Sequence, residues 1–109
     1  GCYKMSKEIE AIIKTVCEES NITFVELCSK RRSGKLTKAR IIFVILCQKI
    51  LGSSLAEIGK YISKNHATIS RYEKRYEEEN WENAFISNKI NYFDMLYKKT
   101  VKEINNGRS

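Results

Sequence analysis

The sequence contains no proline, and it has only five glycines and one histidine in 109 residues. Proline and glycine form most turns of many-stranded folds, so their scarcity favours long helices over a sandwich or barrel. The longest apolar run, residues 41–47, is far shorter than the roughly 18 residues that a membrane span needs. No basic segment followed by an apolar stretch and a small-residue cleavage site opens the chain. We therefore expect a cytoplasmic protein that does not contact membranes.

The four cysteines, at positions 2, 17, 28 and 47, form no C-x-x-C pair. Zinc sites take closely spaced pairs of ligands, so we expect neither a metal nor a cofactor. Cys17, Cys28 and Cys47 lie among apolar residues at helical spacing, which is typical of buried thiols in a reducing compartment. No nucleophile is accompanied by a base and an orienting group, so we expect no enzyme and no small-molecule substrate.

The net charge of +7 is concentrated in one part of the chain. Residues 28–75 contain twelve Lys and Arg against two acids, a balance of +10, whereas the remaining residues carry a balance of −3. Such a concentration indicates a polyanionic partner, because each phosphate that is neutralised releases condensed counterions. Nucleic acid is the leading candidate, ahead of an anionic membrane surface.

Helical periodicity predicts an all-α domain of six helices. They span residues 6–20, 23–30, 37–51, 54–62, 65 to about 76, and 81 to about 104, with a frayed tail over 105–109. The apolar run in the third helix also permits a strand, but its length and flanking residues favour a central buried helix. The expected core contains Ile13, Val16, Leu27, Cys28, Ile42, Leu46, Leu55, Ile58, Ile69 and Phe93, with one of Phe24 and Val25.

Capping residues support these boundaries. Thr23 with Glu26, and Ser54 with Glu57, form the pattern of a capping box. Single caps are expected at the starts of the first, third and fifth helices, at Ser6, Thr37 and Asn65. Gly52 suits the C′ position of the third helix, and Gly34 supports a loop over residues 30–35.

Residues 54–76 fit a helix-turn-helix, with a short helix, a tight turn over 63–65 and a second helix. Ile69 and Tyr72 point inward on the second helix, which leaves its polar first turn free to enter a major groove. Many helical hairpins with this outline bind only protein, so the pattern alone does not decide between DNA and a protein partner.

Six ordered blocks of residues 9–75 resemble the C-terminal DNA-binding domain of the bacterial chromosomal replication initiator, DnaA. They are Val16-Cys17-Glu18-Glu19, Val25-Glu26-Leu27, Ser29-Lys30-Arg31-Arg32-Ser33, Ala39-Arg40, Ser54-Leu55-Ala56-Glu57-Ile58-Gly59 and His66-Ala67-Thr68-Ile69. The resemblance implies a bacterial protein with a Trp-repressor-like helix-turn-helix, the fold of the initiator's domain IV. It also implies binding of double-stranded DNA in the control of replication initiation or transcription.

Carried onto this sequence, the resemblance implies two sets of site residues. The base-reading set is Arg32, in the minor groove, with Asn65, His66, Ala67 and Thr68 in the major groove. The set for phosphate or minor-groove contacts is Lys30, Arg31, Lys35, Lys38, Arg40, Lys64, Ser70, Arg71, Lys74 and Arg75.

The sequence departs from the family at the turn. The family's Gly-Gly-Arg-Asp is one residue shorter here, as Ser63-Lys64-Asn65. Aspartate can accept a hydrogen bond from cytosine, whereas Asn65 prefers adenine, and Ala67 offers thymine a methyl group but no hydroxyl. We therefore expect a preferred site that differs from the initiator's own.

The resemblance stops after Arg75, so we expect a DNA-binding domain over residues 1–79 and an added helix over 80–109 that packs on it. The apolar face of that helix leaves an alternative function open. The chain can instead be a protein-interaction module whose last helix docks a partner or forms a homodimer.

Overall fold

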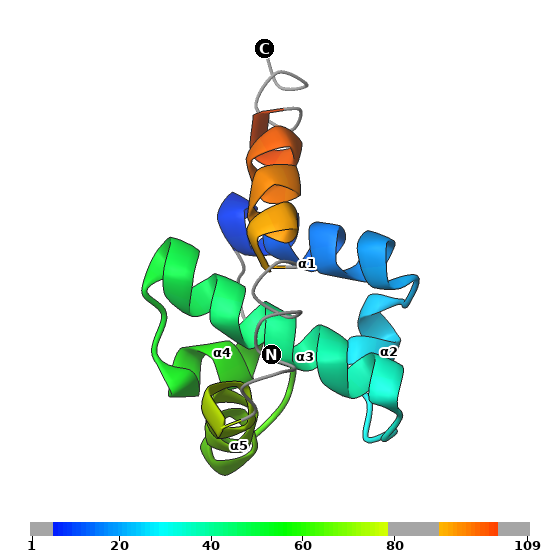
Figure 1. The fold of residues 1–109 in the computed structure, drawn as a ribbon, viewed down its shortest axis with the longest axis vertical. Coiled ribbons are helices and arrows are strands. Elements are labelled where there is room, and N and C mark those ends of the chain that lie inside the picture. Colours follow the sequence, from blue (N-terminus) through cyan, green and yellow to red (C-terminus); the bar gives the residue numbers. More distant parts are fainter. Residues whose placement is uncertain (1–5, 79–89, 103–109) are drawn as a thin grey trace.

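The computed structural model describes residues 6–78 and 90–102, and all of its regular structure is helical (Figure 1). The elements are α1 (Lys7–Ser20), α2 (Phe24–Cys28), α3 (Gly34–Leu46), the π-helical turn η1 (Cys47–Leu51), α4 (Leu55–Tyr61), α5 (His66–Glu78) and a further helix over residues 90–102. Since α3 and η1 together form the predicted third helix, the six-helix, all-α prediction is confirmed.

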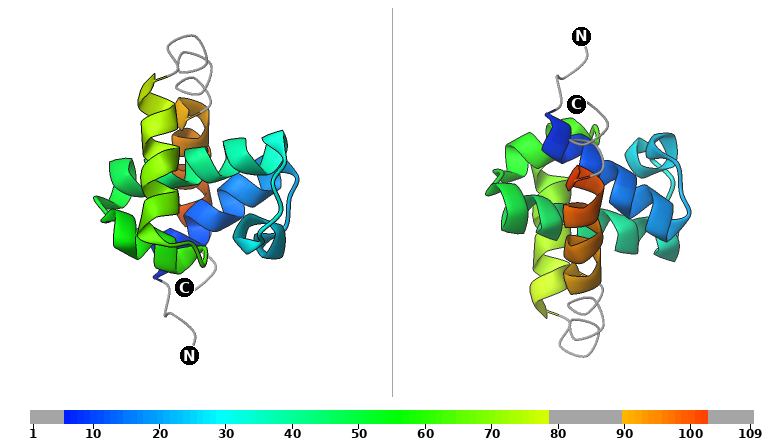
Figure 2. Two further views of the ribbon diagram at one scale, coloured as in Figure 1. Left: turned by 90° about the horizontal axis from the view of Figure 1, so that it is seen from below. Right: turned by 90° about the horizontal axis from the view of Figure 1, so that it is seen from above.

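The centre of the fold is α3, which is buried along most of its length. Phe43, Val44 and Leu46 have no exposed surface, as expected for an apolar run that packs on several sides. Helices α1 and α5 both pack against α3. Figure 2 shows α5 and the helix of residues 90–102 on opposite faces of the layer that α1 and α3 form.

The predicted core is confirmed at most positions. Val16, Leu27, Ile42, Leu46, Ile58, Ile69 and Phe93 are buried in one cluster, and Ile13, Cys28 and Leu55 pack against it while partly exposed. The prediction for α2 is wrong in part, because Phe24 is 38% exposed and Val25 78% exposed. A helix of only five residues turns a single residue, Leu27, fully into the core.

Four predicted caps are present. Ser6 accepts a hydrogen bond from the backbone N–H of Ile9. Both capping boxes, at Thr23 and at Ser54, have reciprocal bonds. The oxygen Oδ1 of Asn65 accepts from the backbone N–H of Thr68 at 2.8 Å. Sequence patterns therefore located four helix starts, because a side-chain cap acts within one turn.

The predicted start of the third helix is wrong by one turn. Ser33 rather than Thr37 is the cap, with its Oγ accepting from the N–H of Leu36 at 3.1 Å, and Gly34 is the first helical residue. The earlier start places Leu36 on a buried helical face, where it is 3% exposed. The basic loop consists of residues 29–33, because α2 ends at Cys28, earlier than predicted, and α3 begins at Gly34.

The last turn of the central helix widens into η1. Gly52 follows it with φ of 62°, so the prediction of a left-handed residue there is confirmed. The side chain of Gln48 in η1 donates to Glu73 in α5 at 2.5 Å, and this bond ties the widened turn to the second helix of the helix-turn-helix.

The described cysteines are free thiols, as expected. Cys47 is buried, while Cys17 and Cys28 are half-buried. Burial raises the pKa of Cys17 to about 11 and raises the pKa of Cys28 and Cys47 as well. The three thiols are therefore protonated at neutral pH and act as small apolar side chains.

The helix of residues 90–102 buries Ile90, Phe93 and Tyr97 in the same core as α1 and α3. The predicted beginning of this helix at residue 81, its apolar residues Phe85, Ile86 and Ile104, and the tail over 105–109 lie outside the described residues. In the part of the chain that the structure describes, no helix has the length and apolar character to cross a membrane.

Gly59 in α4 is a position where the fold excludes a side chain. A Cβ at Gly59 would lie 2.4 Å from the backbone oxygen of Lys64, in the turn before α5. Alanine normally stabilises a helix by about 1 kcal/mol relative to glycine. Because the obstacle is backbone, we expect Gly59→Ala instead to lower the free energy of unfolding by about 1–3 kcal/mol, measured by chemical denaturation.

Gly34→Ala is the matched control, because nothing lies within 4 Å of a Cβ added at Gly34. We expect this substitution to raise the free energy of unfolding by up to about 1 kcal/mol. A higher free energy of unfolding for both variants would contradict the close packing of α4 against the turn.

Candidate nucleic-acid interface

Helices α4 and α5 meet through a turn of four residues, 62–65. The backbone N–H of Lys64 donates to the oxygen of Gly59 at 2.8 Å, and Ser63 adopts a left-handed conformation with φ of 58°. Ile58, Ile62 and Ile69 are fully buried and hold the two helices on the core. The arrangement is that of a helix-turn-helix, in which the first turn of the second helix faces outward.

The first turn of α5 presents three exposed residues, Asn65, His66 and Ala67, followed by the half-buried Thr68. Oδ1 of Asn65 already accepts from Thr68, while the N–H groups of Nδ2 are left for a further partner. Reading adenine by two bonds would require the same oxygen to accept again. The oxygen has a second lone pair for such a bond, so the preference of Asn65 for adenine stays a prediction.

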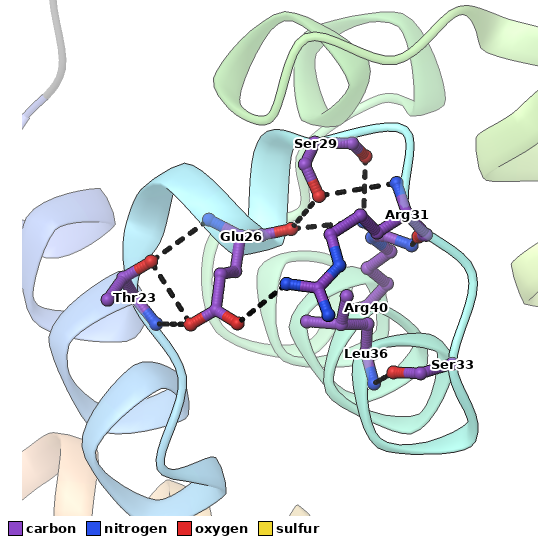
Figure 3. Close-up of polar contacts among 7 residues, drawn as sticks. All are labelled: Thr23, Glu26, Ser29, Arg31, Ser33, Leu36 and Arg40. Carbon is purple, nitrogen blue, oxygen red and sulfur yellow. Dashed lines mark hydrogen bonds and ion pairs between the residues drawn. The ribbon is translucent and has the colours of Figure 1, made fainter.

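Arg40 is the residue that organises the basic loop (Figure 3). Its Nε donates to the backbone oxygen of Leu27 at 2.9 Å, and its Nη1 to that of Arg31 at 2.8 Å. Its Nη2 donates to the oxygens of Glu26 at 3.1 Å and Ser29 at 2.7 Å. One guanidinium thus binds the end of α2 and the loop that follows it.

This geometry corrects the expectation that Arg40 contacts phosphate. The residue is only 2% exposed, and four of its five N–H groups have backbone partners. A phosphate contact needs donors that face solvent. The sequence contained a signal for this burial, because Arg40 lies between Leu36 and Phe43 at helical spacing on the buried face of α3.

The two arginines of the loop differ in direction. Arg31 faces Glu26, with 3.6 Å between Nη1 and Oε2, and its backbone N–H donates to the Oγ of Ser29 at 3.3 Å. Arg32 instead lines a groove between the loop and α5. The pKa of the Glu26 carboxyl is lowered mainly by the capping bonds from Thr23. The ion pair with Arg31, which lies at the surface, lowers it further.

The groove occupies about 780 Å³ between the basic loop, the start of α3 and one face of α5. It brings together side chains that are up to 45 positions apart in the sequence, and most of them are cationic. The residues that line it are Lys30, Arg32, Ser33, Gly34, Thr37, Arg40, Lys64, Thr68, Arg71, Tyr72 and Arg75.

Among the predicted residues of α5, Thr68, Arg71 and Arg75 line the groove on one helical face. Lys74 is exposed beside them, and Ser70 is half-buried. Thr37 and Tyr72 also line the groove and were absent from the predicted set. The sequence predicted Thr37 as a helix cap and therefore not as a site residue.

Lys35 and Lys38 lie apart from this groove. They border a smaller one of about 320 Å³, together with Glu19, Ala39, Ile42, Tyr92 and Phe93 among others. Since α3 separates the two grooves, these lysines do not join the cluster formed by Arg32, Arg71 and Arg75. The described residues hold no group of three or more His, Cys, Asp or Glu that could ligate a metal.

The fold and the groove define a helix-turn-helix domain with a basic loop beside its second helix. The sequence model of the family described as bacterial dnaA protein helix-turn-helix matches residues 9–75. The chain belongs to this family, as the resemblance predicted. The helix of residues 90–102 lies beyond the matched segment.

Several relatives are chromosomal replication initiator proteins DnaA. The protein from Thermodesulfovibrio yellowstonii is 35% identical over 94 residues, which cover 85% of this chain and 21% of the relative. The protein from Helicobacter hepaticus is 34% identical over 83 residues, covering 75% and 18%, and that from Leptospira biflexa is 29% identical over 90 residues, covering 76% and 20%. The chain thus spans about a fifth of the length of these relatives.

Arg40→Met tests the structural role of the guanidinium. The variant keeps the length and the apolar part of the side chain but removes the guanidinium donor from four backbone oxygens. Two of them, those of Glu26 and Ser29, keep another donor. We expect the free energy of unfolding to fall by about 2–4 kcal/mol, measured by chemical denaturation.

Arg71→Met is the control from the same groove, since Arg71 is exposed, and we expect it to change stability by less than about 0.5 kcal/mol. Equal, small effects of both substitutions would contradict the role assigned to Arg40.

Proposed function

We propose that this domain binds double-stranded DNA in a sequence-specific way, through the first turn of α5 and the basic loop together. The observation that carries the proposal is the groove in which Arg32, from the loop, and Arg71 and Arg75, from α5, line one cavity. Three cations converging from two elements match a polyanion that passes along both. The exposed first turn of α5 supports base contacts at the same surface.

In the proposed complex, the first turn of α5 enters the major groove. Asn65, His66, Ala67 and Thr68 then meet base edges, and the N-terminal end of the helix favours a nearby phosphate. Arg32 enters the adjacent minor groove, where a narrow A·T-rich segment concentrates negative potential and attracts a guanidinium.

Phosphate contacts fall to the cations that face solvent around this surface. We assign them to Lys30, Arg71, Lys74 and Arg75, with Ser70 as a polar neighbour. Arg31 serves less well because it faces Glu26, and Lys35 and Lys38 border the other groove. Arg40 is excluded by its backbone bonds.

The relatives are chromosomal replication initiators, which supports a role for this domain in the control of replication initiation. The chain spans about a fifth of those proteins, so we propose for it the DNA-binding part of such a role and no catalytic step. Transcriptional control would use the same surface, and the sequence of the preferred site distinguishes the two.

One observation favours a second function, docking of a protein partner or a second copy through the helix of residues 90–102. Tyr92 and Met95 on that helix are 47% and 58% exposed, although three of its other apolar residues are buried. Docking of apolar side chains responds little to salt, whereas phosphate binding weakens steeply, so one titration separates the two functions.

We expect affinity for duplex DNA to fall with salt, with a slope of log K against log salt concentration on the order of −4 to −5. The five groove-side cations Lys30, Arg32, Arg71, Lys74 and Arg75 set this value. The measurement is fluorescence anisotropy on a labelled duplex at several salt concentrations. A slope near zero would contradict DNA binding and favour the docking function.

Two lysine variants calibrate the titration. Lys74→Met should reduce the magnitude of the slope by about 0.9 and weaken binding to all duplexes alike, because a phosphate contact carries no base information. Lys14→Met, an exposed position on α1 away from the groove, should leave the slope unchanged.

A further inference from the structure

Lys64 joins the two parts of the proposed interface. It lies in the turn before α5, and its Nζ donates to the backbone oxygen of Ser29 in the basic loop, 35 positions earlier in the chain. The same oxygen accepts from Nη2 of Arg40 at 2.7 Å. One carbonyl group of the loop is therefore bound by a cation from α3 and a cation from the helix-turn-helix.

The backbone of Lys64 is held in place as well as its side chain. Its backbone N–H donates to the oxygen of Gly59, and its backbone oxygen lies where a side chain at Gly59 would otherwise be. The side chain is half-buried, and this burial lowers the pKa of Lys64, with smaller contributions from the neighbouring charges of Arg40 and Lys30. A flexible lysine that only faced phosphate would not need either attachment.

The consequence concerns the distance between the two reading elements. Arg40 fixes the loop on α3 by binding the oxygens of Ser29 and Arg31, and Arg32 follows directly. Lys64 directly precedes Asn65, the N-cap of α5. A bond from Lys64 to Ser29 thus connects the base-reading turn to the loop that carries Arg32.

We propose that Lys64 is a positioning residue, which sets the loop of Arg32 relative to the first turn of α5 so that one duplex engages both at once. This inference rests on the proposed function, and it replaces the sequence-based expectation that Lys64 contacts phosphate. Its bond to Ser29 leads from the turn over residues 62–65 to the basic loop.

The test uses the whole chain and a duplex with the site that the native protein selects from a random library. Lys64→Met removes the ammonium and keeps the length of the side chain. We expect affinity for this duplex to fall about fivefold to tenfold, because the loop of Arg32 is then no longer held against the turn and must be ordered on binding. The salt slope should stay as it is in the native protein, unlike the slope of Lys74→Met.

A double-mutant cycle with Arg32→Ala measures the coupling. In the native protein we expect Arg32→Ala to cost about tenfold on the selected duplex. In the Lys64→Met background, where the loop has lost its bond to the turn, we expect a cost below about threefold. Lys64→Arg, which keeps both donor and charge, should restore the larger cost.

A reduction of the slope by about 0.9, or equal costs of Arg32→Ala in both backgrounds, would overturn the positioning role. If Lys64→Met does not fold at the assay temperature, we measure Lys64→Gln with the same expectations. The side chain of glutamine is too short to reach Ser29 from this position. Failure of the native protein to bind any duplex would instead contradict the proposed function, and the positioning role, which rests on it, would fall with it.

Discussion

The guanidinium of Arg40 is the constraint on which the proposed interface depends. The chain must leave α2, pass through a polar loop and enter α3 within five residues, and the loop has few backbone partners of its own. By donating to four backbone oxygens, Arg40 supplies the partners that regular secondary structure would otherwise give. The loop is thereby held in one shape before any ligand arrives.

Arginine suits this position for a physical reason. Its planar fork offers five donors in fixed directions, whereas lysine offers one compact ammonium. A buried positive charge carries a large desolvation cost, which its hydrogen bonds to carbonyl dipoles offset. The charge also remains close to the groove that Arg40 lines, so it adds to the positive potential there without contacting a phosphate.

A loop fixed in this way makes binding less costly. A mobile basic loop would lose conformational freedom when it entered a minor groove, and that loss would reduce affinity. The widened turn η1, with its bond from Gln48 to Glu73, anchors α5 on the opposite end of the same central helix. Both proposed reading elements are therefore attached to α3, and the packing of the core sets their relative position.

The sequence predicted the features that depend on neighbouring residues. Helix caps at Thr23 and Ser54 act within one turn, and the apolar spacing of α3 identified its place at the centre. Ser33 and Thr37 are both competent caps one turn apart, and the choice between them depends on burying Leu36 against distant helices. Local patterns do not contain that information.

The long-range contacts of the candidate site were beyond prediction for the same reason. Sequence reasoning placed Arg32 and the first turn of α5 in the site, because the family resemblance carried them. It treated Arg40 and Lys64 as ordinary surface cations, although both bind the oxygen of Ser29. A backbone oxygen has no residue-specific signature, so only the assembled fold identifies it as a partner.

Selection of sites from a random duplex library, with the native chain and two variants, tests the central claim that two elements read one site. We expect the native protein to select one site with two separate blocks of preference. Arg32→Ala should erase an A·T-rich block only. Asn65→Asp keeps an oxygen for the cap but replaces the amide donor by an acceptor, so it should shift the other block toward cytosine. Selected sites that are identical for all three proteins would contradict the claim.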